Sequence, residues 1–224
     1  MVWRRHGRFR RRHLLSRRID CSIVKLLIMR KRKVIGVDAD EILAEFMEHF
    51  LVFHNLKYQT SFSKNEISSF RFEEVFKIEE KAVLRRIGEF YEAEAVSEIE
   101  PVKGAIQGIN KLLEKGYELE IITARPPYYR EITVAWVEKH FPEKFKQIHF
   151  AFNPFNKNSE RLTKAEICKQ IGAGVLIDDN LVNALDCAEN GITVYLMNAP
   201  WNQTEDLPGN VIRVESWEDI VERL

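Results

Sequence analysis

The chain has few cysteines, and their number and spacing do not suit disulfide bonds or a metal site. There are three, Cys21, Cys168 and Cys187, an odd number without a CxxC pair. This pattern argues against a disulfide framework and against a structural zinc site. Free thiols fit a reducing compartment, so we expect an intracellular protein.

Long apolar runs are also missing. The longest near the N-terminus, Ile23 to Met29, is interrupted by Lys25. It is far shorter than the about 18 residues of a membrane-spanning helix, so we expect no membrane span. With 45% hydrophobic and 30% charged residues, the composition is that of an ordinary folded protein. One catalytic domain is expected at this length.

The chain has no net charge because two opposite imbalances cancel. Residues 1–33 carry ten Arg and three Lys against one acid, Asp20, and have a net charge of +12, whereas residues 34–224 have −12. An Arg-rich, acid-poor segment is typical of a mitochondrial transit peptide, and we expect a disordered extension over 1–33. A basic arm for nucleic acid or anionic lipid, a tail without a role and a true start at Met29 are alternatives. We expect a mitochondrial protein if the segment is a transit peptide, and a cytoplasmic one otherwise.

From Val34 onward, short apolar segments alternate with amphipathic helical ones, which predicts βα units around a parallel sheet. The expected strands are Val34–Val37, Leu119–Ile122, Ile148–Phe152, Val175–Ile177 and Thr193–Leu196. Two helices should bury one face each, formed by Ala105, Ile109, Leu112 and Leu113 and by Leu181, Ala184, Leu185 and Ala188. Gly116 and Gly191 should end them. The expected fold class is α/β, a doubly wound parallel sheet of the Rossmann-like kind.

One interval interrupts this alternation. Between Phe46 and Ile99 there is no convincing buried strand, only helical patterning with many aromatic residues. The interval directly follows the first strand, so it would cover the carboxyl ends of the strands, where α/β folds bind their ligands. The sequence therefore predicts a small helical cap, residues 46–99, on a catalytic core of residues 34–45 and 100–224.

Two of the expected strands end in paired acidic residues. Asp38 and Asp40 follow the first strand, and Asp178 and Asp179 follow the fourth. Parallel strands end at the same edge of a sheet, and burying carboxylates there is costly unless a cation or a catalytic task compensates. Carboxylate oxygens suit Mg²⁺, so we predict a magnesium site at this edge. A solvated turn and a Ca²⁺ loop are the alternatives, although the alternating ligands of such a loop are absent.

Two further segments could hold a phosphate group. The second strand ends in Thr123-Ala124-Arg125, whose hydroxyl and main-chain N–H groups could bind phosphate oxygens. A Thr at this place is also a common helix cap. Thr163 to Glu166 form a capping-box pattern that places Lys164 in the first turn of a helix. A lysine there opposes the helix dipole unless an anion lies beside it, and an ordinary exposed lysine is the alternative.

In this order and spacing, Asp38-x-Asp40, Thr123, Lys164 and Asp178-Asp179 resemble the four motifs of the haloacid dehalogenase superfamily. The resemblance runs from about Val34 to the C-terminus. Three segments are also similar to the 5′(3′)-deoxyribonucleotidase branch: Asp38 to Phe46, 135–148 and Pro200-Trp201-Asn202. The chain departs from that branch in two places, with Glu41 where Gly is usual and Thr123-Ala124 in place of Thr-Ser.

This resemblance implies a two-step phosphoryl transfer. Asp38 would attack phosphorus and form an aspartyl-phosphate, and Asp40 would protonate the leaving oxygen and later activate water. The resemblance also implies Mg²⁺ as the cofactor, held by Asp38, the Asp40 carbonyl and the acids of the fourth motif. Of these acids, Asp179 is expected as the direct ligand and Asp178 behind it, although their roles could be exchanged.

The resemblance further implies how a substrate would bind. Lys164, Thr123 and Ala124 would hold the phosphate, and Phe46 would stack on a nucleobase, with an ordinary core position as the alternative for this ring. The expected substrate is a nucleoside monophosphate. Another small phosphomonoester, such as a sugar phosphate or a nucleic acid 3′-phosphate, and a non-catalytic phosphate-binding or regulatory domain are alternatives. Nucleic acid is not the expected partner, and a homodimer is left open.

Overall fold

The computed structural model of the chain describes residues 33–152 and 162–224. The predicted N-terminal extension, 1–33, lies outside the described residues except for Lys33, so the transit peptide stays a prediction. These described residues belong to one compact unit. Within the described residues, none of the helices has the length and apolar character needed to cross a membrane.

Six parallel strands form one sheet in the order β3-β2-β1-β4-β5-β6. Their bounds are β1 (Val34–Val37), β2 (Glu118–Thr123), β3 (Ile148–Phe150), β4 (Ala173–Asp178), β5 (Thr193–Met197) and β6 (Val211–Val214). From β1, the chain first adds β2 and β3 on one side of this strand and then β4, β5 and β6 on the other side. This arrangement confirms the predicted α/β class with a doubly wound parallel sheet.

The two edges of the sheet differ from the expectation. β3 ends at Phe150 instead of Phe152, whose side chain is 46% exposed. β6 was not predicted, and its residues Ile212 and Arg213 are only half buried. An edge strand pairs on one side only, so it needs no continuous apolar run, and its sequence signal is weak.

Successive strand residues face two different apolar layers. In β2, for example, Ile121 packs into one layer and Ile122 into the other. The first layer includes α5 (Ala105–Glu114), α6 (Arg130–His140) and α9 (Trp217–Arg223), and the second includes α7 (Lys164–Ile171) and α8 (Leu181–Glu189). Helices therefore cover both faces of the sheet, as in other doubly wound folds.

The predicted helix faces and helix ends are present. Ala105, Ile109 and Leu112 are buried on α5, and Ala184 and Ala188 on α8, while Leu113, Leu181 and Leu185 are half buried. Gly116 and Gly191 follow these helices with φ of 88° and 77°, a left-handed conformation that favours glycine.

One close helix contact supports the loop after β1. A Cβ atom on Gly108 of α5 would lie 2.4 Å from Cε3 of Trp217 in α9, so only glycine allows the two helices to approach this closely. The Trp217 indole donates a hydrogen bond of 2.8 Å to the carbonyl of Ile42. The last helix of the chain thus anchors the loop that carries the predicted catalytic aspartates.

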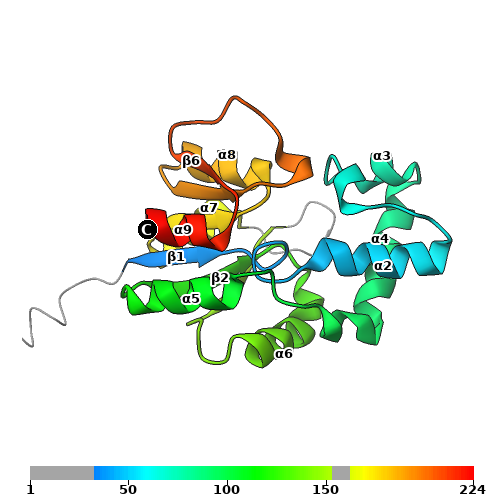
Figure 1. Cartoon of the computed structure of the whole chain (residues 1–224), viewed down its shortest axis with the longest axis horizontal. Helices are drawn as coiled ribbons and strands as arrows, with labels where there is room; N and C mark the ends of the chain where they lie inside the picture. Colours follow the sequence, from blue (N-terminus) through cyan, green and yellow to red (C-terminus); the bar gives the residue numbers. More distant parts are fainter. Residues whose placement is uncertain (1–32, 153–161) are drawn as a thin grey trace, which may run out of the picture. The chain divides into compact units, whose positions relative to one another are not determined.

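Residues 46–99, called the cap from here on, are helical as expected (Figure 1). The elements are α2 (Phe46–Tyr58), η1 (Lys64–Glu66), α3 (Phe72–Phe76), α4 (Glu80–Glu92) and η2 (Glu94–Glu98). The helix α4 packs against both α2 and α3, and the ring of Phe50 contacts those of Phe72, Phe76 and Phe90. The division of the chain into a cap domain and a core domain stays a prediction.

Candidate active site

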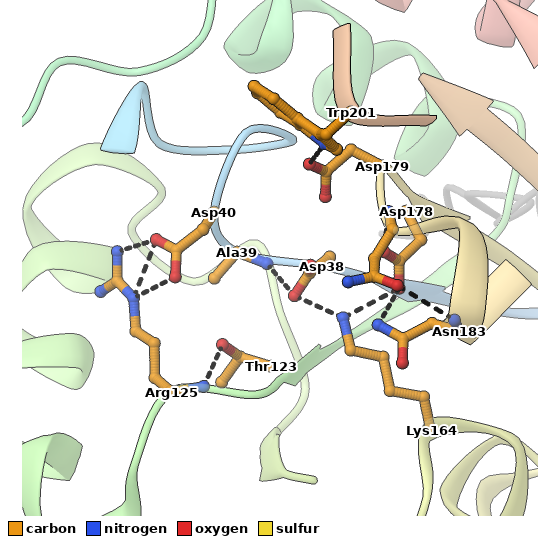
Figure 2. Close-up of polar contacts among 11 residues, drawn as sticks. Asp38, Ala39, Asp40, Thr123, Arg125, Lys164, Asp178, Asp179, Asn183 and Trp201 are labelled. Carbon is orange, nitrogen blue, oxygen red and sulfur yellow. Dashed lines mark hydrogen bonds and ion pairs between the residues drawn. The ribbon is translucent and has the colours of Figure 1, made fainter. Parts of the chain in front are cut away.

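The three central strands of the sheet end in predicted site residues. β1 lies between β2 and β4, and it is followed by Asp38, while Thr123 ends β2 and Asp178 ends β4. The Asp38 N–H donates to the carbonyl of Ile177 in β4 at 2.9 Å, which ties the two strand ends together. Figure 2 shows Asp38 at the centre of the site, between Lys164 on one side and Asp40 on the other. The predicted convergence of the strand ends is therefore present.

Lys164 lies between two of the carboxylates. It is the first residue of α7, where Thr163 and Glu166 form the predicted capping box, with hydrogen bonds of 3.3 and 2.8 Å. Its Nζ is 2.7 Å from Oδ1 of Asp38 and 2.8 Å from Oδ2 of Asp178. Burial by itself would lower the pKa of Lys164, but Asp178 and Asp38 outweigh it and raise the pKa above its usual value. These two carboxylates are the anions that stabilise a lysine at the start of the helix.

Three buried carboxylates form a group that could hold a metal ion. Asp38, Asp178 and Asp179 each offer one oxygen, and these atoms lie within 4.8 Å of one another. Burial raises the pKa of Asp38 to about 7, although Lys164 opposes the shift. Burial and the charges of Asp178 and Asp38 raise the pKa of Asp179 well above its usual value. A divalent cation would offset this repulsion, and three carboxylate oxygens are a donor set that fits Mg²⁺.

The two neighbouring acids at the end of β4 have different partners. Asp178 accepts the Asn180 N–H through Oδ1 at 2.8 Å and contacts Lys164 through Oδ2, with the Asn183 amide 3.4 Å from the same oxygen. Asp179 accepts the Trp201 indole N–H through Oδ2 at 2.8 Å (Figure 2). Both oxygens of Asp178 are thus engaged by the protein, whereas Trp201 holds only one oxygen of Asp179.

Asp40 lies away from the three buried carboxylates and pairs with Arg125. The guanidinium approaches the carboxylate through Nε, at 3.1 and 3.2 Å, and through Nη2, at 2.6 Å (Figure 2). The Arg125 side chain is 1% exposed and that of Asp40 28%. The Arg125 main-chain N–H also donates to Oγ1 of Thr123 at 3.1 Å, so one residue contacts both the second aspartate and the predicted phosphate-binding threonine.

A family comparison agrees with this arrangement. The model of the family described as 5′ nucleotidase, deoxy (pyrimidine), cytosolic type C protein matches residues 32–224. The chain belongs to this family. It is a phosphoric monoester hydrolase of the haloacid dehalogenase superfamily, as the motif resemblance implied. A relative from Bacillus cereus, described as a candidate nucleotidase, is 22% identical over 189 residues, which cover 83% of this chain and 94% of that protein.

Solved structures share the fold of this 5′ nucleotidase family member. A predicted phosphatase from Clostridium acetobutylicum is 14% identical and superimposes with a TM-score of 0.61, covering 86% of this chain and 97% of that chain. A haloacid dehalogenase-like hydrolase from Streptococcus pneumoniae is 15% identical with a TM-score of 0.60, covering 86% and 98%. A candidate hydrolase of the same superfamily from Bacillus subtilis, solved with bound magnesium, is 13% identical with a TM-score of 0.58, covering 86% and 99%. These likenesses concern the fold.

The ring of Phe46, predicted to stack on a base, packs against other rings of the cap in this nucleotidase family member. Its centroid lies 5.9 Å from Phe50, 5.4 Å from Phe90 and 5.8 Å from Tyr91, and the residue is 9% exposed. This environment is that of a core residue. The base-stacking role stays a prediction.

Two contacts of the site were not foreseen from the sequence. Arg125 was noted beside Thr123 without a role, and Trp201 was used only for the family resemblance. A buried arginine after a strand end is a signal that could have suggested a carboxylate partner, since buried charges are paired. The Trp201 indole, by contrast, contacts an aspartate 22 residues earlier in the chain, a distance in sequence that no local pattern reveals.

Proposed function

We propose that the protein is a Mg²⁺-dependent phosphomonoesterase that forms an aspartyl-phosphate on Asp38 and acts on nucleoside monophosphates. The observation that carries the proposal is the group formed by Asp38, Asp178 and Asp179 at the ends of two adjacent strands and by Lys164 at the start of α7. A buried cluster with three carboxylates and one lysine is costly for folding, and phosphoryl transfer is a task that uses all of them.

The first step transfers the phosphoryl group to the protein. A carboxylate oxygen of Asp38 forms a bond to phosphorus as the ester bond breaks, and Asp40, protonated for this step, gives its proton to the leaving oxygen. Asp38 is held for this attack, because its Oδ1 accepts the Ala39 N–H at 2.8 Å and contacts Lys164. In the second step Asp40 takes a proton from water, the water oxygen bonds to phosphorus, and the bond from phosphorus to Asp38 breaks. Inorganic phosphate then leaves.

Arg125 supports the proton-transfer role of Asp40. Its bidentate contact holds the carboxylate in one orientation, and Nη1 of the buried guanidinium also contacts Oγ1 of Thr133 at 3.5 Å. Asp40 remains partly exposed, so its carboxylate can reach both a leaving group and an incoming water. The same contact network includes Thr123, which we propose as a phosphate ligand together with Lys164 and the main chain of Ala124.

A bound Mg²⁺ would neutralise charge on the phosphate oxygens and on the buried carboxylates. We propose Asp38, Asp179 and the main-chain carbonyl of Asp40 as its protein ligands, with Asp178 behind them. The partners of the two acids support this choice, because Lys164, Asn180 and Asn183 already engage both oxygens of Asp178. Asp179 keeps one oxygen for a metal ion.

The family match and the nucleotidase description of the Bacillus cereus relative support a nucleotide as the substrate. The cap follows β1 directly, so it lies at the carboxyl ends of the strands, where it can contact the part of a substrate beyond the phosphate.

A homodimer stays a prediction, which light scattering after size-exclusion chromatography can test.

Release of inorganic phosphate from a substrate panel tests the proposal. The panel should contain 5′- and 3′-monophosphates of nucleosides and deoxynucleosides, sugar phosphates and an oligonucleotide with a 3′-phosphate, each with Mg²⁺ and with EDTA. We expect Mg²⁺-dependent release that is fastest from the nucleoside monophosphates. Faster release from sugar phosphates or from the oligonucleotide would change the substrate class. No release from any compound would support a non-catalytic phosphate-binding domain instead.

A further inference from the structure

Glu41 occupies a backbone position that does not suit it. Its φ is 61°, in the left-handed region that favours glycine, and it stands where the related branch usually has Gly. Its side chain is also buried, which is unusual for a glutamate without a partner. A residue that is unfavourable in both respects indicates compensating contacts, which can have a functional role.

The Glu41 carboxylate joins the loop after β1 to two parts of the cap. Oε1 accepts the main-chain N–H of Met47 at 2.6 Å, one of the N–H groups at the start of α2 that lack a partner within the helix. Oε2 forms an ion pair with Nζ of Lys64 in η1. The Glu41 side chain is 5% exposed and that of Lys64 is 36% exposed, so the pair is shielded mainly on the core side.

Lys64 continues this connection to the proposed metal site. Its Nζ lies 5.7 Å from the ring centroid of Trp201, within the range of a cation–π contact. Phe70 of the cap packs on the same indole, with ring centroids 5.3 Å apart. The Trp201 N–H in turn holds Oδ2 of Asp179. A continuous set of contacts thus runs from Glu41 through Lys64 and Trp201 to the acid proposed as a direct metal ligand.

We propose that Glu41 and Lys64 form a clasp that positions the Trp201 indole, and through it orients the Asp179 carboxylate for metal binding. Both are positioning residues, and the inference rests on the Mg²⁺ site of the proposed function. The physical basis is that hydrogen-bond partners of a metal ligand fix its orientation, so changing them weakens metal binding by roughly 10- to 100-fold. The clasp also makes the metal site sensitive to how the cap lies on the core.

A second ion pair in the cap provides a matched control. Lys57 and Glu89 lie 2.9 Å apart, and Nζ of Lys57 is 5.3 Å from the ring centroid of Phe53. This lysine therefore has the same two kinds of contact as Lys64, a glutamate and an aromatic ring. Lys57, Glu89 and Phe53 all belong to the cap, however, and none of them contacts the carboxylate group at the strand ends or Trp201.

Calorimetric titration of Mg²⁺ into the full chain, without substrate, tests the clasp. We expect Trp201→Phe to weaken Mg²⁺ binding by about tenfold or more, because Asp179 loses its hydrogen-bond donor. Lys64→Met and Glu41→Gln should weaken it less, by about threefold, since each acts through the indole.

The double variant Lys64→Met/Trp201→Phe should bind no more weakly than Trp201→Phe alone, and Lys57→Met should bind like the wild type. The Gln variant keeps an acceptor for the Met47 N–H, and melting curves without Mg²⁺ show whether each variant folds.

The outcomes separate the clasp from the proposed function. If Trp201→Phe weakens binding but Lys64→Met and Glu41→Gln do not, the clasp is rejected and the metal site stands. Additive effects in the double variant would show that Lys64 does not act through Trp201, which also rejects the clasp. If the wild type itself fails to bind Mg²⁺, the proposed metal site is wrong and the clasp with it.

Discussion

Different interactions dominate in two regions of the molecule: the floor of the site, formed by Asp38, Lys164, Asp178 and Asp179, and the cap. At the floor, Lys164 lies within 2.8 Å of two buried carboxylates, and burial shifts the pKa of Asp38 upward. In the cap, Phe50 and its neighbours form a cluster of aromatic rings. Buried charges add little to stability, whereas buried rings contribute much of it. Substitutions at the floor should therefore change activity more than stability, and substitutions in the cap should do the reverse.

The largest effect on activity is expected at the floor, from Asp38→Asn. The amide has nearly the same shape as the carboxylate but cannot attack phosphorus, so turnover should fall by at least about 10⁴-fold. Stability should change little, because Asp178 still pairs with Lys164. Phosphate release and a melting curve on the same sample are the two measurements. Turnover near the wild-type value would remove Asp38 from the chemistry.

The reverse pattern is expected in the cap, from Phe46→Ala. Deleting a buried ring typically costs about 3 to 5 kcal/mol, so the free energy of unfolding should fall by that amount. The hydrolysis of a nucleoside monophosphate and of a small aryl phosphate should decline together. Phe53→Ala, on the same helix but only partly buried, is the control and should cost less. A higher KM for the nucleotide alone, with unchanged stability, would instead support base stacking by Phe46.

A smaller effect is expected from Arg125→Lys, which tests the contact that holds Asp40. A lysine keeps the charge but cannot reproduce the bidentate contact with Asp40. We expect kcat to fall by about 10- to 100-fold with little change in KM, because the proton donor loses its orientation. Steady-state kinetics with an aryl phosphate that has a good leaving group supply the control. Such a substrate needs less help from a proton donor, so its kcat/KM, which reports only the first step, should fall less than that of a nucleoside monophosphate. Equal falls in kcat/KM for the two substrates would argue against positioning of Asp40.

The smallest effect near neutral pH is expected on stability, from the titration of His54 in the cap. His54 is fully buried in the cap, and its Nε2 accepts from the Arg86 guanidinium at 2.7 Å while Nδ1 contacts Thr60 at 2.9 Å. Burial and the Arg86 charge lower the pKa of His54 from 6.5 to about 4. The folded state therefore favours the neutral ring, whose contribution to stability is complete above pH 6.5 and is lost as the pH falls toward 4.

Melting temperatures across that range measure this loss. They should fall as the medium is acidified, and His54→Gln, which cannot titrate, should show a shallower decline. An identical slope for the wild type and the variant would mean that the protonation of His54 is not linked to folding.

The sequence predicted the floor better than the cap for a physical reason. Asp38, Thr123 and Asp178 each follow an apolar strand, and parallel strands necessarily bring such ends together. The capping box that places Lys164 is likewise a local pattern. The cap helices were predicted from their patterning, but the packing of Phe46 depends on rings from α4, more than 40 residues away in the chain. The contacts of Arg125 with Asp40 and of Trp201 with Asp179 are equally non-local, so only the folded chain shows them.

The most direct test of the account is to trap the phosphorylated protein. In Asp40→Asn, an aryl phosphate with a good leaving group should still phosphorylate Asp38, because the first step then needs little proton donation, while the second step is slowed. We predict a burst of aryl alcohol, and after an acid quench a phosphate group located on Asp38 by peptide mass spectrometry and removed by hydroxylamine. The phosphate group on another residue, or a burst with no modified peptide, would contradict the assignment of Asp38 as the nucleophile.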